Sequence, residues 1–191
     1  MQKYVIIEGL DRCGKDTQIG LLQRRYFPEV WQVFHYSKVP FIEKNHHKEY
    51  SELLYSDMFN MMVDSLGNER NLIFNRSHLG EAVYAPLYRD YDGDYVFEIE
   101  ENWLKKTKGL LSERIFMITL VNEPSILIAR DDGEGFSKNE NDIKVEKERF
   151  ERAHWKSSIK NKILINCGTQ SIEDIHQIIY TFIETANLPI L

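Results

Sequence analysis

The 191-residue sequence has few cysteines and no long uninterrupted apolar segment. Its two cysteines, Cys13 and Cys167, are far apart and lack partners at the spacing of a metal site, so neither a disulfide framework nor a zinc module is expected. A membrane-spanning helix needs an apolar run of about 18 residues or more, and the chain has none. The first predicted strand begins without an apolar leader, so we expect a cytoplasmic protein with reduced thiols.

The chain also has no excess of basic residues. The chain has 24 lysines and arginines against 30 aspartates and glutamates, with a net charge of −6 and a pI of about 5.6. Surfaces that coat nucleic acid are usually basic, so nucleic acid is not an expected partner. A local basic pocket for a small anion is compatible with this balance. The length and the 42% hydrophobic content predict one α/β domain over residues 1–191.

Short apolar runs alternate with longer helix-forming stretches along the chain. Strands are predicted at residues 5–7, 33–36, 72–74, 115–121 and 163–165, and helices at 17–26, 50–66, 96–111, 142–156 and 172–185. This alternation predicts a three-layer α/β/α sandwich around a mainly parallel five-stranded sheet. Ligands of such sheets bind at the carboxyl ends of the strands, so the site is expected there.

The strongest functional signal lies in residues 4–17. Gly9-x-x-x-x-Gly14-Lys15 follows a predicted strand and precedes a predicted helix, which is the context of a phosphate-binding P-loop. The two glycines permit a tight turn whose backbone N–H groups surround a polyphosphate, and Lys15 adds a charge for the β and γ phosphates. We therefore expect ATP to contact Gly9, Asp11, Arg12, Cys13, Gly14, Lys15, Asp16 and Thr17.

The position after the P-loop lysine is unusual. It is normally Ser or Thr, whose hydroxyl binds Mg²⁺, whereas this chain has Asp16 followed by Thr17. A carboxylate is a good ligand for Mg²⁺, so Asp16 and Thr17 are the predicted metal-binding residues. An acidic residue in the first turn also favours the helix dipole, so a structural role for Asp16 is the alternative.

Several segments together resemble thymidylate kinases and related nucleoside and nucleotide kinases, particularly the phage-encoded members. Residues 7–18 resemble the family motif Glu-Gly-x-Asp-x-x-Gly-Lys-x-Thr-Gln. Residues 73–77, with Ala82 and Tyr84 after them, resemble the Asp-Arg motif at the end of the third strand. Residues 148–153 resemble the helix that follows the family's lid, and residues 165–179 resemble its closing strand and helix.

The resemblance implies a kinase that uses ATP and Mg²⁺ to convert a pyrimidine deoxynucleoside monophosphate such as dTMP to the diphosphate, and it suggests a homodimer. By resemblance, Asp11 contacts the acceptor deoxyribose, Arg12 clamps the transferred phosphoryl group, and Arg76 binds acceptor or phosphate. Lys15, Arg12 and Arg76 are thus the expected catalytic residues, and Tyr84 is expected near the acceptor base. Residues 131–141 are glycine-containing and aperiodic, which predicts either a lid or a plain surface loop.

Three departures from the family pattern keep alternatives open. Asn75 replaces an acid that supports Mg²⁺, and this loss and the gain of the Asp16 carboxylate could be complementary. Phe59 stands where the family has an arginine, and Lys38 or Arg89 could substitute for that arginine in binding an acceptor phosphate. The alternatives are a kinase of a deoxynucleoside or modified pyrimidine and a nucleotide-binding regulator without turnover.

Overall fold

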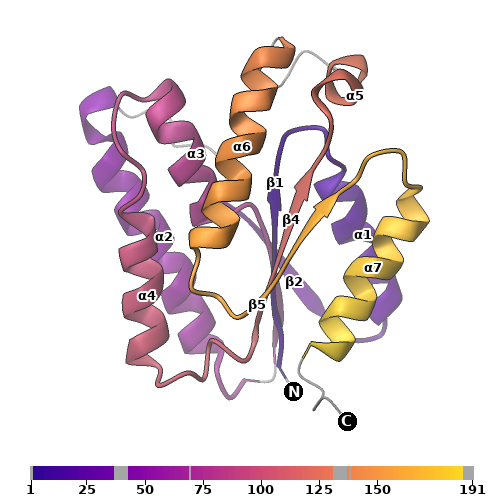
Figure 1. The fold of residues 1–191 in the computed structure, drawn as a ribbon. Coiled ribbons are helices and arrows are strands. Elements are labelled where there is room, and N and C mark those ends of the chain that lie inside the picture. Colours follow the sequence, from indigo (N-terminus) through magenta and orange to yellow (C-terminus); the bar gives the residue numbers. More distant parts are fainter. Residues whose placement is uncertain (1, 37–42, 69, 131–136, 138, 187–191) are drawn as a thin grey trace.

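A computed structural model of the chain describes residues 2–36, 43–68, 70–130, 137 and 139–186 (Figure 1). The strands are β1 (Tyr4–Gly9), β2 (Trp31–His35), β3 (Asn71–Asn75), β4 (Ile115–Val121) and β5 (Asn161–Asn166). The α-helices are α1 (Lys15–Tyr26), α2 (His47–Ser65), α3 (His78–Tyr88), α4 (Val96–Lys106), α5 (Pro124–Ala129), α6 (Glu140–Lys156) and α7 (Ile172–Thr185), and a short 3₁₀ turn covers Lys44–His46.

The five strands form one sheet in the order β2-β3-β1-β4-β5, and every neighbouring pair is parallel. The two central strands, β1 and β4, are buried along their whole length. Their nearly continuous apolar sequences are typical of parallel strands that are covered on both faces. The predicted five-stranded sheet is therefore confirmed.

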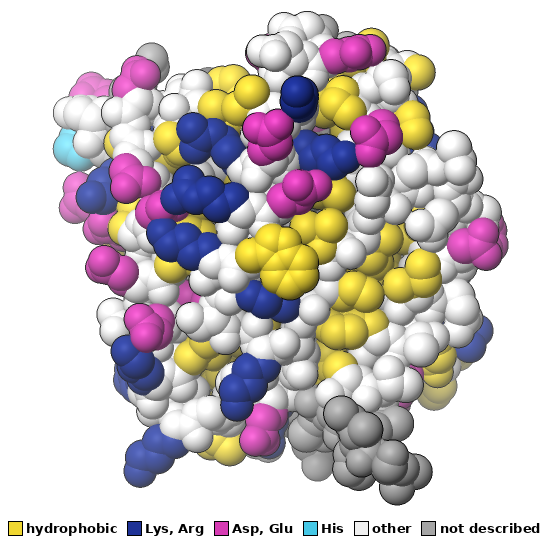
Figure 2. Space-filling view, viewed as in Figure 1, with side chains coloured by type: hydrophobic (Ala, Val, Ile, Leu, Met, Phe, Trp, Pro, Cys, Tyr) yellow, Lys and Arg dark blue, Asp and Glu magenta, His cyan; other side chains and the backbone are white. Residues whose placement is uncertain are grey.

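Helices cover both faces of this sheet (Figure 1). Helices α1 and α7 lie on one face, and α2, α3, α4 and α6 lie on the other, which gives the predicted three layers. Figure 2 shows basic and acidic side chains interspersed over the α4 and α6 side, and apolar side chains between α6 and α7, where β5 is the edge strand. Within the described part of the chain, each helix is too short or too polar to cross a bilayer.

The element boundaries follow local backbone geometry. β4 and α7 match the predicted ranges, whereas α1 begins at Lys15, two residues before the predicted start. Gly14 is its N-cap in the left-handed conformation, with φ of 82°. α4 ends at Lys106 and not at the predicted residue 111, because Lys108 and Gly109 have φ of 50° and 87° and cannot continue the helix.

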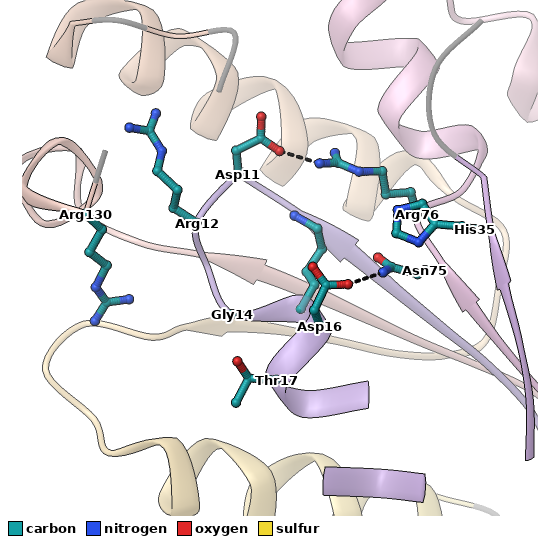
Figure 3. A pocket seen from close by; sticks show the side chains of 10 residues that line it. Asp11, Arg12, Gly14, Asp16, Thr17, His35, Asn75, Arg76 and Arg130 are labelled. Carbon is teal, nitrogen blue, oxygen red and sulfur yellow. Dashed lines mark hydrogen bonds and ion pairs between the residues drawn. The ribbon is translucent and has the colours of Figure 1, made fainter. Parts of the chain in front are cut away.

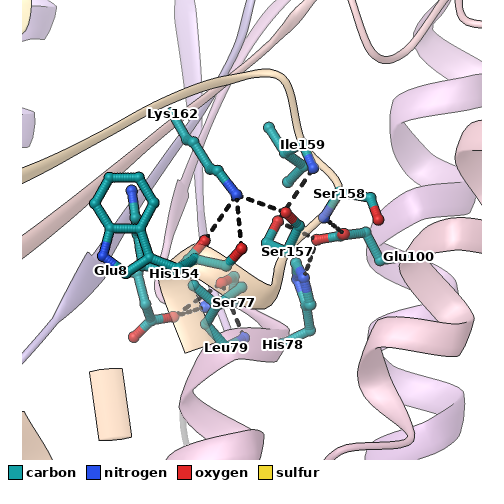
Figure 4. Close-up of polar contacts among 11 residues, drawn as sticks. Glu8, Ser77, His78, Leu79, Glu100, His154, Ser157, Ser158, Ile159 and Lys162 are labelled. Atoms are coloured by element: carbon teal, nitrogen blue, oxygen red, sulfur yellow. Dashed lines mark hydrogen bonds and ion pairs between the residues drawn. The ribbon is translucent and has the colours of Figure 1, made fainter. Parts of the chain in front are cut away.

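A buried polar cluster anchors the start of α3 (Figure 4). The carboxylate of Glu8 in β1 accepts hydrogen bonds from the backbone N–H and, at 2.9 Å, from the hydroxyl of Ser77. His78 Nε2 lies 2.7 Å from Glu100 of α4, and the Ser157 hydroxyl also donates to Glu100 at 2.7 Å. These bonds tie α3 to the sheet and to α4, and so they hold the segment between β3 and α3 in place.

Candidate nucleotide-binding site

The turn after β1 requires its first glycine. Gly9 has φ of 132°, and a Cβ at this position would lie 1.9 Å from the carbonyl oxygen of Leu120 in β4. Arg12 and Gly14 also have positive φ, of 64° and 82°, which gives the loop the alternating backbone of an anion-binding nest. No heavy atom of the described residues lies within 4 Å of a Cβ built on Gly14, so the loop is open on that side.

Lys15 is held across this loop. Its side chain is buried, and its Nζ donates to the carbonyl oxygens of Gly9 at 3.0 Å and Leu10 at 2.7 Å. Burial and the nearby charge of Arg76 lower the pKa of Lys15. An anion bound in the loop would offset both effects, so the ammonium group is placed to bind phosphate.

The loop opens into a pocket of about 470 Å³ at the carboxyl ends of β1, β2 and β3, the predicted edge of the sheet (Figure 3). Four lining side chains are cationic and two are acidic, which favours a polyanionic ligand. The lining residues are Asp11, Arg12, Gly14, Lys15, Asp16, Thr17, His35, Asn75, Arg76 and Arg130.

Arg76 and Asp11 pair across the pocket. Arg76 Nη2 donates to Asp11 Oδ1 at 2.5 Å. Burial by itself would raise the pKa of Asp11, but the charges of Arg76 and Lys15 outweigh it and the pKa is lowered. Arg76 also has φ of 72°, which is uncommon for a residue with a side chain and typical of functional sites.

Arg12 reaches from the P-loop towards α6. Its Nη2 donates to the carbonyl oxygen of Ser137 at 3.0 Å. The Ser137 hydroxyl donates to the buried carboxylate of Glu146 in α6, and the Tyr88 hydroxyl donates to the same oxygen at 2.5 Å. Arg12 is thus connected to a network that joins α3 and α6.

Asp16 and Asn75, the two departures from the family pattern, are in contact. Asn75 Nδ2 donates to Asp16 Oδ1 at 2.5 Å, and Figure 3 shows the pair beside Thr17. Asn75 is 3% exposed at the end of β3, whereas Asp16 is exposed in the first turn of α1. Carboxylate and hydroxyl oxygens of this kind are the ligands that Mg²⁺ prefers, so the donor set fits that ion.

The two cysteines, far apart in the sequence, meet behind the P-loop. Cys167 Sγ lies 4.0 Å from the carbonyl oxygen of Cys13, and both thiols are buried. The hydrogen bond with Cys167, together with burial, raises the pKa of the Cys13 thiol well above its usual value. Cys13 is therefore a packed thiol on the inner side of the loop, joined to the segment after β5.

Sequence reasoning missed two pocket residues, His35 and Arg130. His35 is the last residue of β2, and the rule that ligands bind at the carboxyl ends of parallel strands would have found it. Arg130 follows α5, a helix for which no range was predicted. Figure 3 shows Arg130 on the opposite side of the P-loop from Arg76.

Three other positions considered for the acceptor are not among the described residues that line this pocket. Tyr84 is buried, packs its ring 5.6 Å from that of Phe150, and is not among the described residues that line the pocket. Arg89 donates to the buried carboxylate of Glu81, so its positive charge is already paired with an acidic side chain of the protein. Phe59, which stands where the related kinases have an arginine, is fully buried.

Two expectations fall wholly or largely outside the described residues. Lys38 lies outside them, as do residues 131–136 and 138 of the candidate lid. From the rest of that segment, Asn139 caps α6 by accepting a hydrogen bond from the backbone N–H of Asp142 at 3.0 Å. The lid stays a prediction.

No protein-family model matches the sequence, and no curated protein is significantly similar to it. Solved structures do match it. YorR from Bacillus subtilis, crystallised with phosphorylated GDP, is 21% identical with a TM-score of 0.67, and the match covers 95% of this chain and 96% of YorR. Thymidylate kinase from Candida albicans is 16% identical with a TM-score of 0.62, over 97% of this chain and 92% of that one.

This chain has the α/β P-loop fold. A third match, deoxyadenosine kinase from M. mycoides with bound dATP, is 14% identical with a TM-score of 0.55 and covers 95% of this chain and all of that one. At these identities the similarity establishes the fold and leaves the reaction to be argued from the pocket.

Proposed function

We propose that this protein is a kinase that transfers the γ-phosphoryl group of ATP to a pyrimidine deoxynucleoside monophosphate of the dTMP type. The observation that carries the proposal is the pocket in which Asp11 of the P-loop pairs with Arg76 of the neighbouring strand end. The phosphate-binding loop provides a donor side, and the pair between Asp11 and Arg76 provides an acceptor side.

The donor side consists of the P-loop and the side chains around it. The backbone N–H groups of residues 11–15 and the Lys15 ammonium group bind the β and γ phosphates. Arg12, whose guanidinium group donates to the Ser137 carbonyl oxygen in this structure, would stabilise charge on the moving phosphoryl group. Asp16 and Thr17 would hold Mg²⁺, which neutralises phosphate charge when it is bound. Arg130 lies where it can contact the nucleotide from the far side of the loop.

The acceptor side consists of Asp11 and Arg76. The Asp11 carboxylate can accept a hydrogen bond from a sugar hydroxyl. Arg76 can bind a phosphate group through two parallel hydrogen bonds. A monophosphate oxygen is already nucleophilic, so this reaction needs positioning and charge neutralisation and no general base.

A nucleoside acceptor is the second candidate. Phe59 is in the core and Arg89 is paired with Glu81, so these two positions supply no further cation for an acceptor phosphate. His35 lines the pocket next to Asn75 and Arg76, where an imidazole could take the proton of a sugar hydroxyl.

The acceptor is tested by measuring ADP release from ATP with a panel of acceptors. We expect dTMP, dUMP or a 5-substituted relative to be used in preference to dAMP and dGMP, and thymidine to be a poor acceptor. Faster turnover with thymidine than with dTMP would establish the second candidate instead. Tight ATP binding without ADP release for any acceptor would identify a nucleotide-binding regulator.

A further inference from the structure

The contact between Asp16 and Asn75 joins an exposed carboxylate to a rigid part of the sheet. The backbone carbonyl of Asn75 accepts a hydrogen bond from Tyr36 at 3.0 Å, and Asn75 is paired in register with Ile7 of β1 and His35 of β2. Its side chain is buried, while that of Asp16 is exposed at the pocket. An otherwise mobile carboxylate is thereby fixed from one side.

The chemistry of the contact gives each side chain one role. The amide N–H₂ of Asn75 donates to Oδ1 of Asp16 at 2.5 Å, and this contact leaves both lone pairs of Oδ2 for a cation. A second carboxylate at position 75 would face the first at hydrogen-bond distance, and like charges so close repel strongly. An amide at position 75 is therefore the partner that a carboxylate at position 16 requires.

We propose that Asn75 is a positioning residue that orients the Asp16 carboxylate so that its second oxygen binds the Mg²⁺ of the nucleotide. The inference rests on the proposed function, because it assumes that Mg·ATP occupies the P-loop. Under this proposal the pair has one net negative charge. The carboxylate of Asp16 in α1 carries it, and the amide of Asn75 at the end of β3 orients that carboxylate. Removing the orienting partner of a metal ligand typically costs about 10- to 100-fold in metal affinity, which sets the size of the expected effect.

The experiment measures how strongly Mg²⁺ tightens nucleotide binding, independently of turnover. A fluorescent ATP analogue is titrated in EDTA and again in Mg²⁺, and the ratio of the two dissociation constants is the tightening factor. The variants are Asp16→Asn and Asn75→Leu, with Asn75→Ser as the replacement if the leucine variant does not fold. The control is Asn166→Leu, because Asn166 ends β5 and donates to Glu123 at 3.1 Å, an amide–carboxylate pair outside the pocket.

We expect Asp16→Asn to reduce the tightening factor by at least about tenfold while binding in EDTA is unchanged or stronger, because a negative charge near the polyphosphate is removed. We expect Asn75→Leu, or Asn75→Ser in its place, to reduce the tightening factor by about tenfold and to leave binding in EDTA unchanged. The control variant Asn166→Leu should have the tightening factor of the wild type. A wild-type factor in Asp16→Asn would overturn the metal role of Asp16. A wild-type factor in the Asn75 variant alone would overturn the positioning role.

A second measurement tests the pairing itself. Asn75→Asp places two carboxylates together and should lower the melting temperature at pH 7, whereas the exchange variant Asp16→Asn/Asn75→Asp restores one amide and one carboxylate and should regain most of that loss. Purely additive effects of the two substitutions would contradict a paired unit. Failure of the wild type to bind ATP would instead contradict the proposed function, so the two failures are distinguishable.

Discussion

Arg76 and Asp11, 65 residues apart in the sequence, form a 2.5 Å ion pair across the mouth of the pocket. Asp11 belongs to the loop after β1, and Arg76 follows β3, the neighbouring strand. The pair leaves the rest of the Arg76 guanidinium group for a ligand, because one Nη atom carries the contact. It is the reason we propose that the acceptor binds between the ends of β1 and β3.

Arg76→Lys should therefore affect the acceptor more than the donor. Lysine keeps the charge but cannot form two parallel bonds to a phosphate, so kcat/KM for the monophosphate should fall by about 100-fold, as for loss of one oxyanion-stabilising group. Binding of the ATP analogue should change by less than about threefold. Arg24→Lys, at an exposed position of α1, is the matched control. An equal loss of ATP affinity would place Arg76 on the donor side.

Lys15→Ala should abolish most phosphoryl transfer without unfolding the protein. The side chain contacts loop carbonyl groups and faces the pocket, so the expected loss in kcat is about 100- to 1,000-fold. The buried ammonium group is costly to desolvate, so the melting temperature should stay close to that of the wild type or rise slightly. Wild-type turnover in this variant would remove Lys15 from the mechanism.

Gly9→Ala should destabilise the fold, whereas Gly20→Ala should not. A Cβ at Gly9 would meet the Leu120 carbonyl at 1.9 Å, and φ is 132°, so we expect a loss of about 3 kcal/mol or more in the free energy of unfolding. Gly20 lies inside α1 with no described heavy atom within 4 Å of its Cβ, and alanine there should stabilise by about 0.5–1 kcal/mol. Urea unfolding of both variants measures the difference, and similar stabilities would show that the loop can move away from β4.

The buried His154 should make the protein acid-sensitive. Burial, with a smaller effect of Lys162, lowers the pKa of His154 to about 4, and its Nδ1 lies 2.9 Å from the Thr119 hydroxyl. The unfolded chain binds this proton at its ordinary pKa of about 6.5, so the folded state loses stability as pH falls from about 6.5 towards 4.

His154→Asn should reduce that acid sensitivity. Asparagine can keep a polar atom near Thr119 and does not titrate, so the fall in melting temperature between pH 7 and pH 5 should be smaller than in the wild type. His46→Asn, at an exposed position, is the control and should leave the fall unchanged. An unchanged fall in His154→Asn would assign the acid sensitivity to other groups.

The sheet and the P-loop could be read from the sequence because their signals are local. Residues 115–121 are apolar without a break, and Gly9, Gly14 and Lys15 stand at fixed spacing after a strand, so short-range sterics and burial determine both features. The predicted ends of α1 and α4 were less accurate. Residues such as Lys108 adopt a left-handed backbone conformation that cannot be predicted from the residue type.

Contacts between distant segments were decided by the tertiary structure alone. Parallel pairing of β1 with β3 brings Asp11 to Arg76, and the packing of α1 on the sheet brings Asp16 to Asn75. The pairing of Arg89 with Glu81 likewise depends on how the chain turns after α3. Residue types and local spacing therefore determined that this chain has a P-loop at a strand end, because backbone geometry there is local. The partners of its charged side chains follow from the order of the strands, because that order sets which strand ends are neighbours.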